Sequence, residues 1–218
     1  GGRPPVRAGD VGQGPGGATS EKKCDVRSMP NKSLGKLGVE IAEECYVRVA
    51  QVLLMRANSS VSPRYIIPEK TFETASELFD LIKKEVGKSD IIFHTAAVSD
   101  FELDVSVKGK ISSKESLVLK LKPSPKIIYQ IKKLNPKIKL IAFKAEFGLT
   151  DPEMIKKAEK KMEESDADAI VVNDISKSDR GFESEMNEVI IVLKNGESAK
   201  IPLDSKNEIA RGIVELFV

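Results

Sequence analysis

The sequence predicts an α/β protein with a doubly wound, Rossmann-like, mostly parallel sheet, and three observations support this. Short apolar runs of strand length alternate with amphipathic segments of helix length. Ser/Thr-x-x-Glu capping boxes mark the starts of two of those helical segments. Polar residues follow directly where three of the apolar runs end. We therefore expect helices on both faces of the sheet and a ligand site along its carboxyl edge.

Length and composition are those of one globular domain. The chain has 218 residues, of which 40% are hydrophobic and 31% are charged. We expect a flexible segment over residues 1–15 and a single domain over 16–218. No apolar run is long enough to cross a bilayer, and the N-terminal stretch lacks the apolar core of a secretory signal. A cytoplasmic protein is therefore expected.

Metal-binding and histidine-based chemistry find little support in the sequence. Cys24 and Cys45 lack metal-ligand spacing. His94 is the only histidine and lies inside an apolar run, where a core residue is the more ordinary interpretation. We expect no metal site built from side chains and no Ser-His-Asp triad.

The small net charge of +2 conceals a strongly uneven distribution. Residues 108–144 hold eleven lysines against one acid, a net charge of about +10, and residues 145–188 hold thirteen acids against six bases. The basic block lacks the interleaved aromatic residues of a single-strand nucleic-acid binder. A local positive field fits a small polyanion such as a nucleoside triphosphate, although a solvated lysine face is equally consistent with the charge alone.

The first half of the chain predicts alternating strands and helices. Leu37 and Ile41 lie on one face of a helix that begins near Ser33, and Thr74 and Glu77 form a capping box. The expected order is helix 33–48, strand 51–56, a short strand at 65–67, helix 74–86 and a strand starting at residue 91.

The second half begins with an insertion and then resumes the alternation. Alternating apolar residues over 101–122 predict a lysine-rich hairpin that could act as a lid. Ser124-Pro125 predicts a helix start, as does the Thr150–Glu153 box, and Asn195-Gly196 predicts a hairpin turn. The expected order is helix 124–134, strand 138–143, helix 150–164, strand 168–173, strands 189–193 and 199–202, and a helix from a second capping box at Ser205 to about 217.

Polar side chains at three strand ends define the candidate site: Ser99 and Asp100, Lys144 and Glu146, and Asn173 and Asp174. The small residues Ala96 and Ala97 would let a flat ligand lie against the backbone, although a tightly packed strand end is the blander alternative. Gly35 and Gly38 near a helix start would permit close approach of an anion to free N–H groups.

Five ordered motifs in these segments resemble the phosphopantothenate–cysteine ligase family (phosphopantothenoylcysteine synthetases), in its stand-alone archaeal and eukaryotic-like form. The resemblance covers residues 16–217. The motifs are Asp25-Val-Arg-Ser-Met-Pro-Asn-Lys-Ser-Leu-Gly-Lys-Leu-Gly38, Ala96-Ala-Val-Ser-Asp100, Lys110-Ile-Ser-Ser, Phe143-Lys-Ala-Glu, and Asn173-Asp-Ile-Ser with Gly181-Phe-Glu-Ser-Glu-Met-Asn187.

The resemblance implies a ligase that joins L-cysteine to 4′-phosphopantothenate through an acyl-nucleotide, with release of pyrophosphate and a nucleoside monophosphate. It implies that Asn31 holds the activated acyl group, that Arg27 supports that loop and that Lys110 stabilises transition-state charge. Implied substrate-binding residues are Asn31, Ser33, Gly35 and Lys36. Implied nucleotide-binding residues are Ala96, Ala97, Asp100, Ser124, Pro125, Lys126, Ile127, Phe143 and Lys161.

The resemblance further implies Mg²⁺ bound with ATP or CTP, with no protein metal ligands, and a homodimer. No nucleic-acid or membrane partner is expected. Two other functions share the same sheet pattern: a dinucleotide-binding oxidoreductase and a non-catalytic nucleotide-binding module. Against the oxidoreductase, no catalytic Tyr-x-x-x-Lys and no usable glycine-rich turn follows a first strand.

Overall fold

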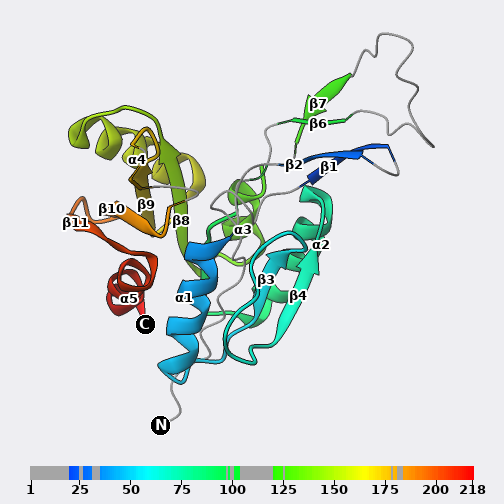
Figure 1. The fold of residues 1–218 in the computed structure, drawn as a ribbon, viewed down its shortest axis with the longest axis horizontal. Coiled ribbons are helices and arrows are strands. Elements are labelled where there is room, and N and C mark those ends of the chain that lie inside the picture. The colour runs from blue at the N-terminus through cyan, green and yellow to red at the C-terminus, as the bar shows by residue number, and fades with distance from the viewer. Residues whose placement is uncertain are drawn as a thin grey trace.

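The computed structural model describes residues 20–24, 27–30, 35–96, 98, 101–103, 120–124, 126–177, 179–180 and 184–218. Helices and strands alternate along most of this part of the chain (Figure 1). The helices are α1 (Lys36–Val47), α2 (Ala75–Glu85), the 3₁₀ turn η1 (Val86–Lys88), α3 (Ile128–Leu134), α4 (Asp151–Ser165) and α5 (Lys206–Phe217). The strands are β1 (Ser20–Cys24), β2 (Arg27–Pro30), β3 (Leu54–Ala57), β4 (Glu69–Phe72), β5 (Ile91–His94), β6 (Phe101–Leu103), β7 (Leu121–Pro123), β8 (Lys139–Glu146), β9 (Ala169–Asp174), β10 (Met186–Leu193) and β11 (Ser198–Ser205).

Within the described residues, the central sheet has five strands in the order β11-β10-β9-β8-β5. Strands β5, β8 and β9 are parallel to one another, while β10 and β11 are antiparallel to their neighbours. Strands β3 and β4 form a separate parallel pair. The predicted parallel sheet is therefore confirmed, although its described strands fall into two hydrogen-bonded groups.

Helices cover both faces of the sheet, as the doubly wound prediction requires. One apolar core joins α1 and α5 to the sheet, and the other joins α2, α3 and α4 to its opposite face (Figure 1). Strand β8 contributes alternately to both, since Ile141 packs in the first core while Leu140 and Ala142 pack in the second. Strand β3 enters both cores, with Leu54 in the first and Met55 in the second, and Phe72 of β4 packs in the second, so the two strand groups belong to one layered structure.

Three helix starts follow the local signals in the sequence. Thr74 and Glu77 form a reciprocal capping box at α2, and Thr150 and Glu153 form one at α4. At α5 the Ser205 hydroxyl accepts a hydrogen bond from Glu208 N at 3.3 Å, which is one half of the expected box.

Helix α1 ends in a backbone turn that is unusual for its residue. Val49 has φ 64°, in the left-handed region, and its N–H donates to Tyr46 O while Ala50 N donates to Cys45 O. This is the hydrogen-bond pattern of a Schellman motif, whose left-handed position is normally glycine. A β-branched residue at this place is strained.

Two predicted elements were misplaced. The short strand expected at 65–67 is absent, and the strand lies at β4, which begins four residues later and pairs with β3. The helix expected from Ser124-Pro125 begins only at Ile128, so Ser124 is not its N-cap. The β1–β2 hairpin was not predicted.

The base of the predicted lysine-rich hairpin is confirmed by the antiparallel pairing of β6 with β7. Its tip, which would form the lid, and residues 1–15 lie outside the described residues.

The β10–β11 hairpin ends the sheet. Gly196 has φ 88° in its turn, which is a conformation that glycine adopts without strain. The register shifts between Asn187 and Val189, so β11 carries one extra residue opposite β10. Most side chains of β11 are exposed. Over the described residues, no helix is long and apolar enough to cross a membrane.

Candidate nucleotide site at the carboxyl edge of the sheet

The carboxyl ends of β8 and β9 bring two of the three predicted polar strand ends together. Glu146 lies opposite Asp174 in the β8–β9 register, and Ala145 lies opposite Asn173. Strand β5 joins the same edge through the pairing of His94 with Ala142. Ser99 and Asp100, the third predicted strand end, lie outside the described residues.

Asp174 has a structural role at this edge. Its Oδ1 accepts hydrogen bonds from Gly148 N at 3.0 Å and from Ser176 N at 2.9 Å, and its Oδ2 accepts from the Ser176 hydroxyl at 2.9 Å. Although burial opposes it, these hydrogen bonds lower the pKa of Asp174. The carboxylate therefore fixes the two loops that leave β8 and β9.

The alternation of β8 directs Lys144 and Glu146 toward α4. Glu146 is buried and forms ion pairs with Lys144 and with Lys157 of α4, the latter at 2.7 Å. Burial would raise the pKa of Glu146, but the hydrogen bonds from these two lysines outweigh it and lower the pKa. Glu146 is therefore a fixed counter-ion for two cations at the strand end.

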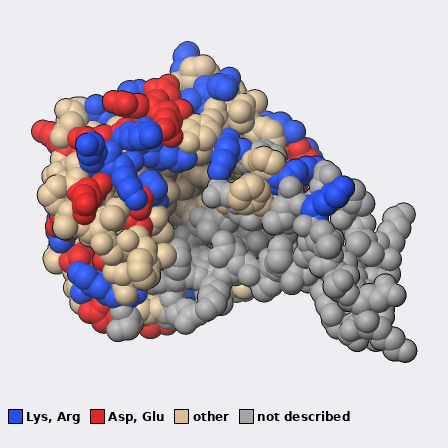
Figure 2. Space-filling model, turned by 90° about the horizontal axis from the view of Figure 1, so that it is seen from above, with Lys and Arg blue, Asp and Glu red and all other residues tan. Residues whose placement is uncertain are grey.

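Four lysines surround a cavity of about 360 Å³ between the end of β8 and α4, which we call the lysine cavity. Three of them lie on α4, where residues separated by three or four positions share one face of a helix. The lining residues are Lys144, Lys157, Lys160, Lys161 and Glu164. Figure 2 shows the molecule from above the view of Figure 1. Over the described part of that face, lysine and arginine side chains are mixed with acidic ones. The local cation cluster thus suits a compact anion better than an extended polyanion.

Tyr129 of α3 connects to this cavity. The Lys161 Nζ donates a hydrogen bond to the Tyr129 hydroxyl at 2.9 Å and lies 4.3 Å from the centre of its ring. The hydroxyl in turn donates to Glu164 at 3.0 Å. Burial and then the Glu164 carboxylate raise the pKa of Tyr129, so the phenol stays neutral. The sequence analysis named Lys161 but missed Tyr129, Lys157 and Glu164, since these contacts join residues on separate elements.

Ser124 is a second predicted nucleotide residue with an unusual environment. It is 4% exposed, and its hydroxyl has no hydrogen-bond partner among the described residues. A buried hydroxyl without a partner costs folding free energy, about 1–3 kcal/mol, unless a ligand or water satisfies it. Because α3 begins at Ile128, this hydroxyl is not used as a helix cap.

The start of α1 has the features of an anion site. Gly35 has φ 67°, no side chain caps the helix, and its first turn holds no acid, whereas α2, α4 and α5 each carry at least one there. Lys36 forms an ion pair with Glu185. Lys206, which was not predicted, lies buried at the start of α5. Burial and the Lys36 charge lower its pKa to about 8, although the Glu185 carboxylate acts in the opposite direction.

The remaining predicted residues do not gather at one place in the described structure. Ala96 and Ile127 pack in the core beneath α3 and α4, and Lys126 is exposed nearby. Phe143 packs on the opposite face of the sheet, in the core under α1 and α5. Arg27 lies in β2, of which only the backbone is described. The predicted residues outside the described part are Asn31, Ser33, Ala97, Asp100, Lys110 and Pro125.

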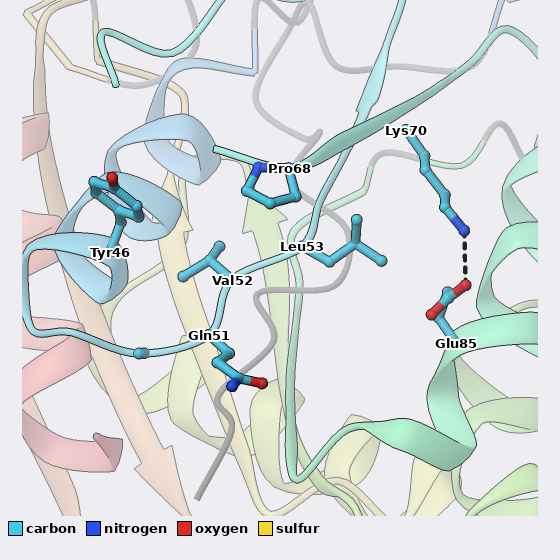
Figure 3. Close-up of a pocket in the computed structure, with 8 residues that line it drawn as sticks. Tyr46, Gln51, Val52, Leu53, Pro68, Lys70 and Glu85 are labelled. Carbon is cyan, nitrogen blue, oxygen red and sulfur yellow. Dashed lines mark hydrogen bonds and ion pairs between the residues drawn. The ribbon is translucent and has the colours of Figure 1, made fainter. Parts of the chain in front are cut away.

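A larger cavity of about 500 Å³ lies where β3 and β4 begin (Figure 3). Tyr46, Val52, Leu53 and Pro68 supply apolar lining, and Lys70 pairs with Glu85 at 2.7 Å along one side. None of the predicted site residues lines this cavity. It lies at the amino ends of its strands, whereas ligands of open α/β sheets bind at the carboxyl ends.

These features define a class: an α/β protein with a cationic cavity at the carboxyl edge of a mostly parallel sheet and an α1 helix start that no side chain caps. Comparison with known proteins specifies it further. Residues 15–218 match the family model for the DNA/pantothenate metabolism flavoprotein C-terminal domain, and the chain belongs to that family.

Among its relatives, the coenzyme A biosynthesis bifunctional protein CoaBC of Thermococcus kodakarensis is 40% identical over 196 residues, which are 89% of this chain and 47% of that protein. The chain thus spans about half the length of the curated relatives it matches. The crystal structure of the DNA/pantothenate metabolism flavoprotein from Streptococcus pneumoniae has a TM-score of 0.81 at 27% identity, covering 97% of this chain and 96% of that one. The C-terminal domain of a CoaBC protein has a TM-score of 0.75 at 29% identity, covering 97% of this chain and 91% of that one.

Proposed function

We propose that this chain is a ligase of coenzyme A biosynthesis that joins L-cysteine to 4′-phosphopantothenate. A nucleoside triphosphate activates the phosphopantothenate carboxylate as an acyl-nucleotide and pyrophosphate leaves. The cysteine amine then attacks the acyl carbon and displaces the nucleoside monophosphate, forming the amide. Two accessible steps replace one difficult dehydration.

The observation that carries this proposal is the lysine cavity at the carboxyl edge of the sheet, in a chain whose 40% identical relative is a coenzyme A biosynthesis protein. Both chemical steps develop negative charge on oxygen atoms. Positioned ammonium groups and backbone N–H donors stabilise such charge without reorganisation. The cavity supplies the first kind of group and the start of α1 supplies the second.

The proposed roles follow the sequence analysis. Lys161 and the Ser124 hydroxyl bind the nucleotide from the α3–α4 side of the sheet, and Gly35 with Lys36 binds the anionic end of the second substrate at α1. Asn31 holds the acyl group, and Lys110 stabilises its developing charge.

Mg²⁺ bound to the triphosphate is part of the proposal. Among the described residues, no group of three or more His, Cys, Asp or Glu side chains is placed to hold a metal ion. In the proposal the ion is held by phosphates and water, which is the usual coordination of Mg²⁺ at nucleotides. A homodimer and a cytoplasmic location complete the proposal, and light scattering after size-exclusion chromatography tests the dimer.

The test measures pyrophosphate release with ATP, CTP or UTP, Mg²⁺ and 4′-phosphopantothenate, with and without L-cysteine. We expect release that requires phosphopantothenate and that cysteine stimulates, and the preferred nucleotide will be the one that supports it. Lys161→Ala should raise the KM for that nucleotide about tenfold, the value of one charged hydrogen bond. Lys83→Ala, which changes an exposed lysine of α2 paired with Asp80, is the matched control and should leave the KM unchanged.

Release that does not depend on phosphopantothenate would contradict the proposal, as would no release from folded protein. Binding of a nicotinamide nucleotide in place of a triphosphate would indicate the dinucleotide-binding oxidoreductase. Triphosphate binding without any turnover would indicate the non-catalytic module.

A further inference from the structure

The four lysines of the lysine cavity differ in what holds them. Lys144 and Lys157 are paired directly with the buried Glu146 carboxylate. Lys160 lies 3.9 Å from Glu164 and is largely exposed. Lys161 donates to a phenol, the Tyr129 hydroxyl, at 2.9 Å. Tyr129 therefore helps to position the Lys161 ammonium group without carrying a charge of its own.

Tyr129 is well placed to fix the position of a lysine. Its ring packs against the core under α3 and α4, so the ring is anchored. Its hydroxyl is oriented by donation to Glu164 at 3.0 Å, which leaves the oxygen lone pairs to accept from Lys161. The ring also lies 4.3 Å from the same ammonium group, within the range of a cation–π contact.

Such an arrangement matters for binding because a lysine side chain has four rotatable bonds. An unrestrained lysine loses much of that freedom when it contacts a phosphate, and the loss weakens binding. A lysine already held beside the cavity loses less. The connection between α3 and α4 through Tyr129 and Lys161 therefore favours anion binding without a new contact to the anion.

We propose that Tyr129 is a positioning residue that holds the Lys161 ammonium group at the lysine cavity for the phosphates of a nucleoside triphosphate. This rests on the proposed function for the identity of the ligand. Tyr129 acts through Lys161, so its effect on binding should depend on Lys161 being present.

The test is a double-mutant cycle on direct binding of Mg·ATP and Mg·CTP, measured by isothermal titration calorimetry on the full chain. Tyr129→Phe removes only the hydroxyl and keeps the ring. We expect it to weaken binding of the preferred nucleotide about fivefold, and Lys161→Ala to weaken it about tenfold or more. In the Lys161→Ala background, Tyr129→Phe should have no further effect. Tyr46→Phe changes a tyrosine of α1 that lines the other cavity and serves as the matched control.

Turnover gives a second readout. Tyr129→Phe should raise the KM for the nucleotide while kcat stays within about twofold, which a general loss of folding would not produce. An effect of Tyr129→Phe that is undiminished by Lys161→Ala would overturn the inference, as would unchanged binding. If the parent chain binds neither nucleotide, both this inference and the nucleotide role fail. If it binds with the expected coupling but releases no pyrophosphate, the inference stands and the ligase proposal alone fails.

Discussion

Replacing Val49 by glycine should stabilise the protein. Val49 occupies the left-handed position that ends α1, with φ 64°, and its side chain is 84% exposed. The two Schellman hydrogen bonds, Val49 N to Tyr46 O at 2.9 Å and Ala50 N to Cys45 O at 3.1 Å, use only backbone atoms and survive the substitution. The change therefore removes strain and leaves the helix end intact.

The magnitude follows from three contributions. Placing an L-residue with a Cβ in the left-handed region costs about 1–2 kcal/mol, and glycine removes this cost. Glycine also destabilises the variant by about 0.4–1 kcal/mol, because it gives the unfolded chain more conformational freedom. Because Val49 buries so little of its side chain, the lost apolar contact amounts to only about 0.3 kcal/mol. The net gain is about 0.5 kcal/mol, or a Tm higher by about 1–2 °C for a chain of this length.

Thermal and urea unfolding of the parent and of Val49→Gly measure this gain, with two controls. Val49→Ala keeps the Cβ and should not stabilise the protein. Asp166→Gly changes the other non-glycine residue with a left-handed backbone in the described part of the chain; it lies at the end of α4, where an aspartate is tolerated and pairs with Lys194, so no gain is expected. If Val49→Ala stabilised the protein as much as Val49→Gly, backbone strain would not be the cause.

Three further predictions concern the site and the stability of the fold. Lys110→Ala or Asn31→Ala should lower kcat far more than nucleotide affinity. Pyrophosphate release measures kcat, and calorimetry on the same variants measures nucleotide affinity. Full turnover in either variant would refute the role assigned to that residue. Asp168→Asn should cost about 1–2 kcal/mol in urea unfolding, because Asp168 accepts from Leu140 N at 2.7 Å and pairs with a nearly buried lysine. Asp166→Asn, which breaks an exposed ion pair in the same turn, should cost less than about 0.5 kcal/mol, and equal losses would contradict the argument from burial. Lys206 has a folded pKa of about 8 against 10.5 when unfolded, so its buried charge destabilises the fold fully below pH 8 and progressively less up to pH 10.5. The free energy of unfolding of Lys206→Met should exceed that of the parent, and this difference should shrink by about 1–2 kcal/mol between pH 7 and pH 10, after discounting for partial solvation. A difference that does not change with pH would contradict the lowered pKa of Lys206.

Local signals in the sequence located most of the fold. The helix starts at Thr74 and Thr150 and the buried runs of β5, β8 and β9 each depend on residues within a few positions. Strand β4 was placed too early because Glu69–Phe72 is mostly polar and exposed, and its pairing with β3 selects it. Ser124-Pro125 has the residues of a helix start, but the helix begins later.

The candidate site was predicted in part. The two strand ends at Lys144/Glu146 and Asn173/Asp174 followed from the rule that parallel strands share a carboxyl edge. The sequence could not show that Asp174 is occupied by its own loops, or that Glu146 pairs with Lys157 of the next helix. Nor could it show that Tyr129 contacts Lys161, because that contact depends on how α3 packs against α4.

Strand β11 has a consequence for how copies of this chain can meet. An exposed sheet edge offers unpaired backbone groups to any other strand and can seed aggregation. Here the outer strand carries the ring of Pro202, which has no N–H to donate, beside an extra residue that breaks the regular ladder. Lys200 adds a charge that is partly engaged by Asp151. These features disfavour the pairing of a further strand with β11. Association between two copies should therefore use another part of the surface.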